Sequence, residues 1–160
     1  MQYGKDAGPS RAGAPMQGGD FGPRRVVVHL HRAGAQAVAN DVAGYEFQSR
    51  ARIVEVETYL GNIGATSGAT NVDGKLNTVS IFTTVPSIAF NAATKRRRDA
   101  AGPVFPAASG SGGVLTPVFG GPEAGVRVQP GDYYRVDVLA IPGVASADLS
   151  VYLHLMLEDS

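Results

Sequence analysis

Side chains that could carry acid–base chemistry gather near the C-terminus, in the stretch GDYYRVDVLAIPGVASADLSVYLHLML. Asp132 and Asp137 flank a tyrosine pair, and Asp148 and His154 follow later in the same stretch. General acid–base catalysis needs such groups within hydrogen-bond reach of a reacting proton. Whether they converge depends on the strands and turns that carry them.

Asp137 lies on a predicted strand. Alternation of apolar and other residues through YYRVDV predicts a β-strand whose alternate side chains face opposite sides. Asp137 then lies beside Arg135 on the outer face, where a carboxylate is solvated or paired with a cation. The row predicted to face the core is Tyr134, Val136 and Val138.

Turns account for the other two acids. Asp132 lies in the tripeptide PGD, and Asp148 opens the last predicted strand. A short carboxylate favours such positions because it accepts hydrogen bonds from nearby backbone N–H groups. No nucleophile motif such as GxSxG accompanies these acids. The stretch therefore predicts a scaffold, and no catalytic residue is assigned.

Histidines provide the sharpest hint of a metal site. His29 and His31 form an HxH pair on a predicted strand, which points both imidazoles to one face. His154 lies on the outward row of the last strand, so three imidazoles could converge if the first and last strands are neighbours. The alternative is an amphipathic outer face that is partly covered. Without a known strand order, the metal assignment stays a weak candidate.

One dense basic cluster occurs in the chain. A patch that binds nucleic acid is typically interleaved with aromatic residues, which this one lacks, and the chain carries 14 basic and 14 acidic residues for a net charge of +0. Ion pairs with an acidic neighbour, or simple solvation, are therefore favoured over nucleic acid. Arg24 and Arg25, at the start of the predicted domain, could also form ion pairs with an acidic neighbour. The cluster, KRRRD, contributes Lys95, Arg96, Arg97 and Arg98.

Composition limits the class of protein further. The chain of 160 residues has no cysteine, which excludes disulfides and thiolate chemistry. It shows no signal peptide and no apolar run of the roughly 20 residues needed to span a bilayer, so we expect a soluble protein with no membrane partner. Twenty-one glycines, 10 prolines and only 18% charged residues indicate an all-β fold rich in turns.

The chain divides into an arm and a domain. Residues 1–23 are dense in Gly, Ala and Pro, and are predicted to be flexible or to order only on a partner, with Tyr3, Met16 and Phe21 as apolar anchors. Residues 24–160 are predicted to form one antiparallel β-sandwich, jelly-roll-like, of seven or eight strands. Within it, residues 94–125 are expected to form a long loop.

Two predicted strands define most of the core. In ARIVEVETYL, strict alternation places Val54, Val56, Thr58 and Leu60 on one face, with Ile53, Glu55, Glu57 and Tyr59 on the other. In DLSVYLHLMLE, the inward row is Leu149, Val151, Leu153, Leu155 and Leu157. Large apolar groups on the opposite, outer faces call for cover, and they mark a possible interface at Val27, Tyr152 and Met156.

The ordered series of motifs resembles a module of tailed-bacteriophage structural proteins. FQSRARIVEVETYLGNIGATSGATNVDGKLNTVSIFTT is similar to its opening strands and its asparagine-centred turn into SIF. VRVQPGDYYRVDVLAIPGVASADLSVYLHLML is similar to its closing pair of strands. The matching positions are fold-determining: Arg52, Asn77, Ile81, Phe82, Gly131, Asp132, Val136, Val138, Asp148, Leu149 and Val151.

The resemblance implies a non-enzymatic virion protein without a cofactor. Such modules serve as capsid decoration (cement) proteins, head fibres or tail tips, commonly as trimers. We expect a decoration protein on the outer capsid surface that bridges neighbouring major capsid proteins. One alternative is a tail-tip or fibre module that binds a receptor or glycan. Another is a metal-dependent jelly-roll enzyme using His29, His31 and His154.

Overall fold

A computed structural model describes residues 24–82, 84–100, 117–118 and 125–158; the proposed anchors Tyr3, Met16 and Phe21 lie outside this range. No helix occurs among the described residues, so none is long and apolar enough to cross a membrane. They form eleven strands: β1 (Arg25–Ala35), β2 (Ala39–Glu46), β3 (Ala51–Asn62), β4 (Ala69–Leu76), β5 (Val79–Ser80), β6 (Ser87–Ala89), β7 (Arg96–Ala100), β8 (Pro117–Val118), β9 (Gly125–Val128), β10 (Tyr133–Ala140) and β11 (Ala147–Leu157).

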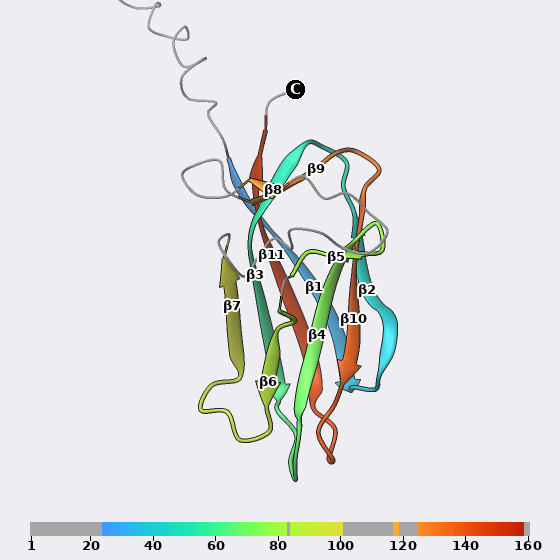
Figure 1. Cartoon of the computed structure of the whole chain (residues 1–160), viewed down its shortest axis with the longest axis vertical. Coiled ribbons are helices and arrows are strands. Elements are labelled where there is room, and N and C mark those ends of the chain that lie inside the picture. Colours follow the sequence, from blue (N-terminus) through green and yellow to red (C-terminus); the bar gives the residue numbers. More distant parts are fainter. Residues whose placement is uncertain (1–23, 83, 101–116, 119–124, 159–160) are drawn as a thin grey trace, which may run out of the picture.

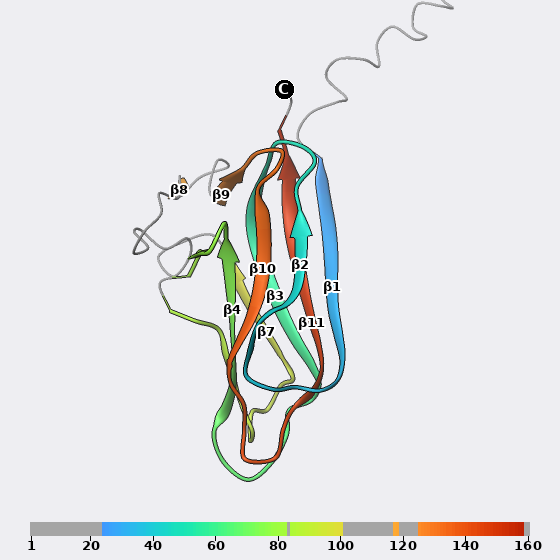
Figure 2. The same ribbon diagram turned by 90° about the vertical axis from the view of Figure 1, so that its right-hand side faces the viewer.

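The strands build two antiparallel sheets packed face to face (Figures 1 and 2). The six-stranded sheet has the order β1-β11-β3-β9-β8, and β7 pairs with β3 as well. The five-stranded sheet has the order β2-β10-β4-β5, and β6 pairs with β4. The predicted all-β antiparallel sandwich is confirmed. The strand number exceeds the expected seven or eight because β5, β6 and β8 are only two or three residues long.

Alternating side chains from both sheets form one core. The inward-facing rows predicted for β10 and β11 are confirmed, and Leu157 packs at the margin of the core. Burying each such side chain contributes roughly 1.5–3 kcal/mol, and a one-residue slip would expose a whole row. The rows therefore fix the strand register. Their buried members are Tyr134, Val136, Val138, Leu149, Val151, Leu153 and Leu155.

Strand β3 departs from strict alternation at Val54. His154 of β11 pairs with Glu55 and Leu155 pairs with Ile53, which leaves Val54 as an extra residue in β3. Such a β-bulge reverses the facing of every residue beyond it. Ile53 is therefore fully buried together with Val56, and the predicted placement of Ile53 and Val54 was wrong.

The structure also differs from the sequence prediction along residues 94–125. Arg96–Ala100 forms β7 beside β3, and Pro117–Val118 forms β8; residues 101–116 and 119–124 lie outside the described residues. Three consecutive arginines resemble a loop by composition alone. Opposite charges across neighbouring strands stabilise them as an edge strand instead.

The tyrosine pair of β10 covers two glycines, one on each face of the five-stranded sheet. Tyr134 points into the core, and its phenol lies where a Cβ at Gly74 of β4 would be. Tyr133 points outward and occupies the same place over Gly44 of β2. Both glycines are needed because an aromatic ring approaches the backbone closely there.

Candidate functional site

The outer face of the six-stranded sheet brings together most of the titratable residues singled out in the sequence. Because β1 pairs with β11 and β11 with β3, outward residues form rows across the three strands. One row holds Val27, His154 and Glu55, and the next holds His29, Tyr152 and Glu57. The condition for convergence of the histidines, adjacent first and last strands, is therefore met.

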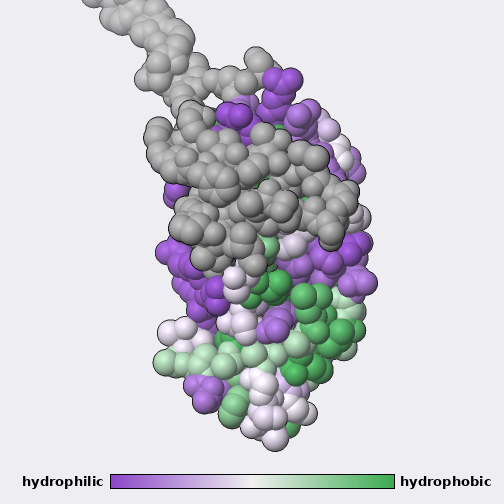
Figure 3. Space-filling model, in the orientation of Figure 1, coloured by the Kyte–Doolittle hydropathy of each residue, from purple (hydrophilic) through white to green (hydrophobic). Residues whose placement is uncertain are grey.

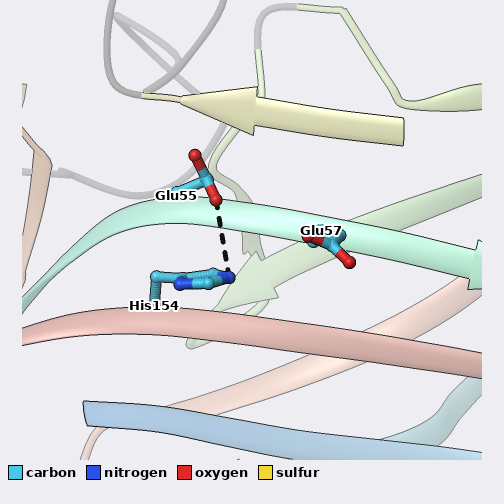
Figure 4. A group of neighbouring side chains, drawn as sticks. All are labelled: Glu55, Glu57 and His154. Carbon is cyan, nitrogen blue, oxygen red and sulfur yellow. Dashed lines mark ion pairs between the residues drawn. The ribbon is translucent and has the colours of Figure 1, made fainter. Parts of the chain in front are cut away.

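A cluster of one imidazole and two carboxylates lies on this face (Figure 4). His154 projects from β11 toward Glu55 on β3, with 3.4 Å between Nε2 and Oε1. Glu57 lies further along β3, and one ligand atom from each residue fits within 4.8 Å of the others. Two carboxylate oxygens and an imidazole are donors that a divalent transition metal accepts.

Guanidinium groups from β7 already satisfy these carboxylates. Arg98 spans both of them, with Nη2 2.8 Å from Glu55 Oε1 and Nε 3.0 Å from Glu57 Oε2. Arg96 Nε lies 3.0 Å from the other Glu57 oxygen. Two carboxylates and two guanidiniums balance in charge, so a divalent cation would have to displace Arg98. The cluster is best described as an ion-pair network that ties β7 to β3.

The other two histidines point elsewhere on the same face. His29 Nε2 and His31 Nδ1 each lie 3.0 Å from the Ser150 hydroxyl oxygen on β11, and His29 stacks on Tyr152 with ring centroids 4.5 Å apart. A hydroxyl can donate to one ring and accept from the other. The three imidazoles share a face but do not converge on one point, because His154 turns to Glu55.

A serine beside histidines also suggests a nucleophile and base. Ser150 is only 6% exposed and lies within β11, with its hydroxyl bonded to both imidazoles. A hydroxyl held in this way braces β1 against β11. Sequence reasoning missed Ser150, and the only available signal was a polar residue on the outward row of a strongly apolar strand.

A second charged cluster lies on the outer face of the five-stranded sheet, around Asp137 of β10. One carboxylate oxygen accepts the backbone N–H of Asp41 at 2.8 Å. The other lies 2.9 Å from Lys75 Nζ and 3.0 Å from Arg135 Nη2. The predicted pairing with Arg135 is confirmed, but the carboxylate is completely buried rather than solvated. Burial opposes ionisation, yet these three donors together hold the pKa of Asp137 below its ordinary value.

Asp73 of β4 sits opposite Asp137 and behaves differently. It accepts a 2.6 Å hydrogen bond from the Ser80 hydroxyl, while Lys75 Nζ is 3.9 Å away. Burial is the dominant influence and raises the pKa of Asp73, although the hydrogen bond from Ser80 and the charge of Lys75 oppose it. Lys75 therefore pairs more closely with Asp137 than with Asp73. Sequence reasoning did not single out Lys75.

Asp132 takes the turn role predicted for it, whereas Asp148 bonds a different strand rather than a neighbouring turn N–H. Asp132 Oδ2 accepts the backbone N–H of Gln129 at 2.8 Å, and its other oxygen accepts from the Asn77 side chain at 2.8 Å. Asp148 Oδ1 accepts the N–H of Gly34 at 2.8 Å. Each carboxylate is used to close a turn or to join two segments, which leaves a structural role for both.

The remaining interface residues fall in different places. Arg24 and Arg25 are exposed at the start of β1, and Lys95 donates to the Gly61 carbonyl at 2.9 Å. Tyr152 and Met156 are half-buried on the outer face of β11. Arg97 points to the face opposite that of Arg96 and Arg98 and is half-buried.

Comparison with known proteins finds no family model, no curated relative and no solved structure that matches this chain.

Proposed function

We propose that this chain is a non-enzymatic structural protein of a phage virion, a capsid decoration protein that bridges neighbouring major capsid proteins. The motif series of the β-strands suggests the class of protein. The structural observation that carries the proposal is an exposed apolar patch on the outer face of the five-stranded sheet, because such surface is what an assembly protein buries.

The patch is formed where β2 begins and β10 ends. Val138 pairs with Ala39, which brings the outward side chains of Leu139 and Val38 next to each other, 42% and 61% exposed. Val144, in the β10–β11 loop, is also exposed. Hydrophobic surface gathers at this end of the molecule in Figure 3. A protein partner that covers it would gain the burial of the Leu139 and Val38 side chains.

The chemistry of the acids supports a role without catalysis. Asp132, Asp137 and Asp148 each bind backbone N–H groups or cations of the fold. Glu55 and Glu57 are paired with arginines. A general acid or base needs a proton site open to a substrate, and these carboxylates are instead used to hold strands and turns together.

The mechanism would combine self-association with attachment to the shell. A stable interface buries about 1,200–2,000 Å² in total, more than the patch alone supplies. Neighbouring copies of the chain, assembled as a trimer, would contribute further buried surface around the patch. The arm, residues 1–23, and the exposed Arg24 and Arg25 would add contacts to adjacent major capsid proteins.

The test is binding to phage capsids that lack this protein, measured by co-sedimentation and located by electron microscopy. We expect the wild-type protein to bind the outside of the shell. Leu139→Glu should weaken binding or trimer formation at least tenfold, since it places a charge in the patch. Thr84→Glu, which adds the same charge at an exposed position between β5 and β6, is the matched control and should bind normally.

Two results would contradict the proposal. Absence of binding to any capsid, with a folded protein, would remove the decoration role. Binding to a defined oligosaccharide on a glycan array, without capsid binding, would favour a receptor-binding tail-tip or fibre module.

A further inference from the structure

An apolar groove opens between the two sheets at the start of β1. Its volume is about 210 Å³. β1 and β2 are the terminal strands of their sheets, so no further described strand closes this side of the sandwich. The inward row of β1 reflects this, because Leu30 is buried while Val28 and Val26 are only half-buried. Apolar side chains line the groove: Val26, Val28, Tyr45, Phe47, Leu155 and Leu157.

The chain itself arrives at the mouth of this groove. The Arg24 carbonyl accepts the backbone N–H of Leu157 at 2.9 Å, so the segment before β1 starts beside a residue that lines the groove. The nearest apolar residue upstream is Phe21, which lies outside the described residues. Three residues span at most about 10 Å, which is enough to bring a phenyl ring back over Val26.

The intervening dipeptide favours such a reversal. Gly22-Pro23 is a turn signal, because glycine adopts conformations closed to other residues and proline fixes its own φ. Size also fits, since an apolar cavity of about 150 Å³ holds a benzene molecule. Covalent attachment gives the ring an effective concentration in the millimolar range at the groove.

We propose that Phe21 docks its phenyl ring into this groove of its own chain, and so fixes the root of the N-terminal segment on the sandwich. The inference goes beyond the proposed function and does not depend on it. Docking would leave Tyr3 and Met16, the two earlier apolar anchors, on a tether that starts from a defined point. It would also complete the core at its open edge.

Tryptophan fluorescence offers a direct test, because the chain contains no tryptophan. In the full-length protein, Phe21→Trp should emit at shorter wavelength, and acrylamide should quench it several-fold less than the matched control Met16→Trp. Equal emission and quenching in the two variants would overturn the proposal. A blue shift that is lost on dilution would overturn it as well, because the occupant would then come from a second copy.

Methyl NMR tests the natural side chain, in case an indole is too large for the groove. Comparison of the wild-type protein with Phe21→Ser should show ring-current shifts at the methyl groups of Val26 and Leu157. The methyl groups of Val56 and Leu60, deep in the core, should keep their positions as internal controls. Unchanged Val26 and Leu157 resonances would refute docking.

Discussion

The two outer faces of the sandwich carry the same kinds of charged residues, but they bury them to different extents. On the five-stranded sheet, Asp137 is completely buried, and its partners Lys75 and Arg135 have side chains 22% and 24% exposed. On the six-stranded sheet, the guanidiniums of Arg96 and Arg98 are more than half exposed. Water therefore reaches the arginines of the second network, although Glu57 is only 7% exposed, and it is excluded from the Asp137 carboxylate of the first.

This difference shows that similar ion pairs can contribute very different amounts to the free energy of unfolding. Exposed pairs contribute about 0–1 kcal/mol because solvent competes with them. A buried charge that loses its partners keeps its desolvation cost, so breaking the pair costs far more than making it gained. The Asp137 cluster should therefore be required for the fold, while the Glu55–Glu57–Arg98 cluster should be adjustable.

The largest effect is expected from Asp137→Ala. The change leaves Lys75 and Arg135 without their shared carboxylate and the Asp41 N–H without its acceptor, so we expect a loss of about 3 kcal/mol in the free energy of unfolding. Urea denaturation measures it. Glu55→Ala, which removes a half-exposed carboxylate from the other network, is the control; a similar loss in both variants would contradict the comparison.

The glycines under the two tyrosines give the next largest contrast. Gly74→Ala collides with the phenol of Tyr134, which is buried in the core and cannot move away, so a loss of about 1–3 kcal/mol is expected. Gly44→Ala collides with Tyr133, which is 38% exposed, so its ring can move into solvent at the cost of one exposed hydrogen bond to Asp41. Thermal unfolding should therefore show a large shift for Gly74→Ala and little for Gly44→Ala. Equal shifts would mean that burial of the ring is unimportant.

Acid titration should separate the two neighbouring aspartates. The lowered pKa of Asp137 gives stability that is present above its ordinary value of 3.8 and is lost as pH falls through the folded pKa. The raised pKa of Asp73 gives the opposite, with stability present below 3.8 and lost as pH rises through the folded pKa.

As pH rises from the folded pKa of Asp137 toward 3.8, Asp137→Asn should therefore become progressively less stable than the wild-type protein, and the deficit should stay constant at higher pH. Asp73→Asn should become progressively more stable relative to the wild-type protein as pH rises above 3.8. Urea unfolding at several pH values measures both trends, and parallel trends would show that the two carboxyls share one environment.

The smallest effect is expected from Arg98→Gln on the exposed network. Loss of its ion pairs should cost about 0.5 kcal/mol at low ionic strength, and the cost should vanish near 1 M NaCl because salt screens exposed charges. The loss of stability caused by Asp137→Ala, by contrast, should change little with salt concentration. An Arg98→Gln effect that survives 1 M NaCl would place this network among the buried ones.

Sequence reasoning succeeded where the signal is local. The inward row of β11 follows from alternation, and the turn role of Asp132 follows from turn chemistry. It failed where the outcome depends on which strands are neighbours. The burial of Asp137 requires Lys75 from β4 and Asp41 from β2, and no period in the sequence pairs those strands.

The candidate site was predicted less completely than the fold for the same reason. Three histidines on one outer face could be anticipated, but Ser150 draws His29 and His31 away from His154 through the register of β1 on β11. The bulge at Val54 adds one residue to β3 and has no compositional signature there. Ion pairs of the β7 arginines with an acidic neighbour were predicted, but the partners Glu55 and Glu57 of the same chain were not.

The bulge in β3 has a consequence for how this sandwich can evolve. β7 ends with Ala100 opposite Glu55, and β9 presents Val126 opposite Ile53, so the chain leaves and returns two residues apart on one strand. The closure entropy of a loop grows only with the logarithm of its length, about 0.6 kcal/mol for each doubling. Extra sequence inserted between Ala100 and Pro117 should therefore cost little in closure entropy, which makes this edge of β3 a natural insertion point for added peptides.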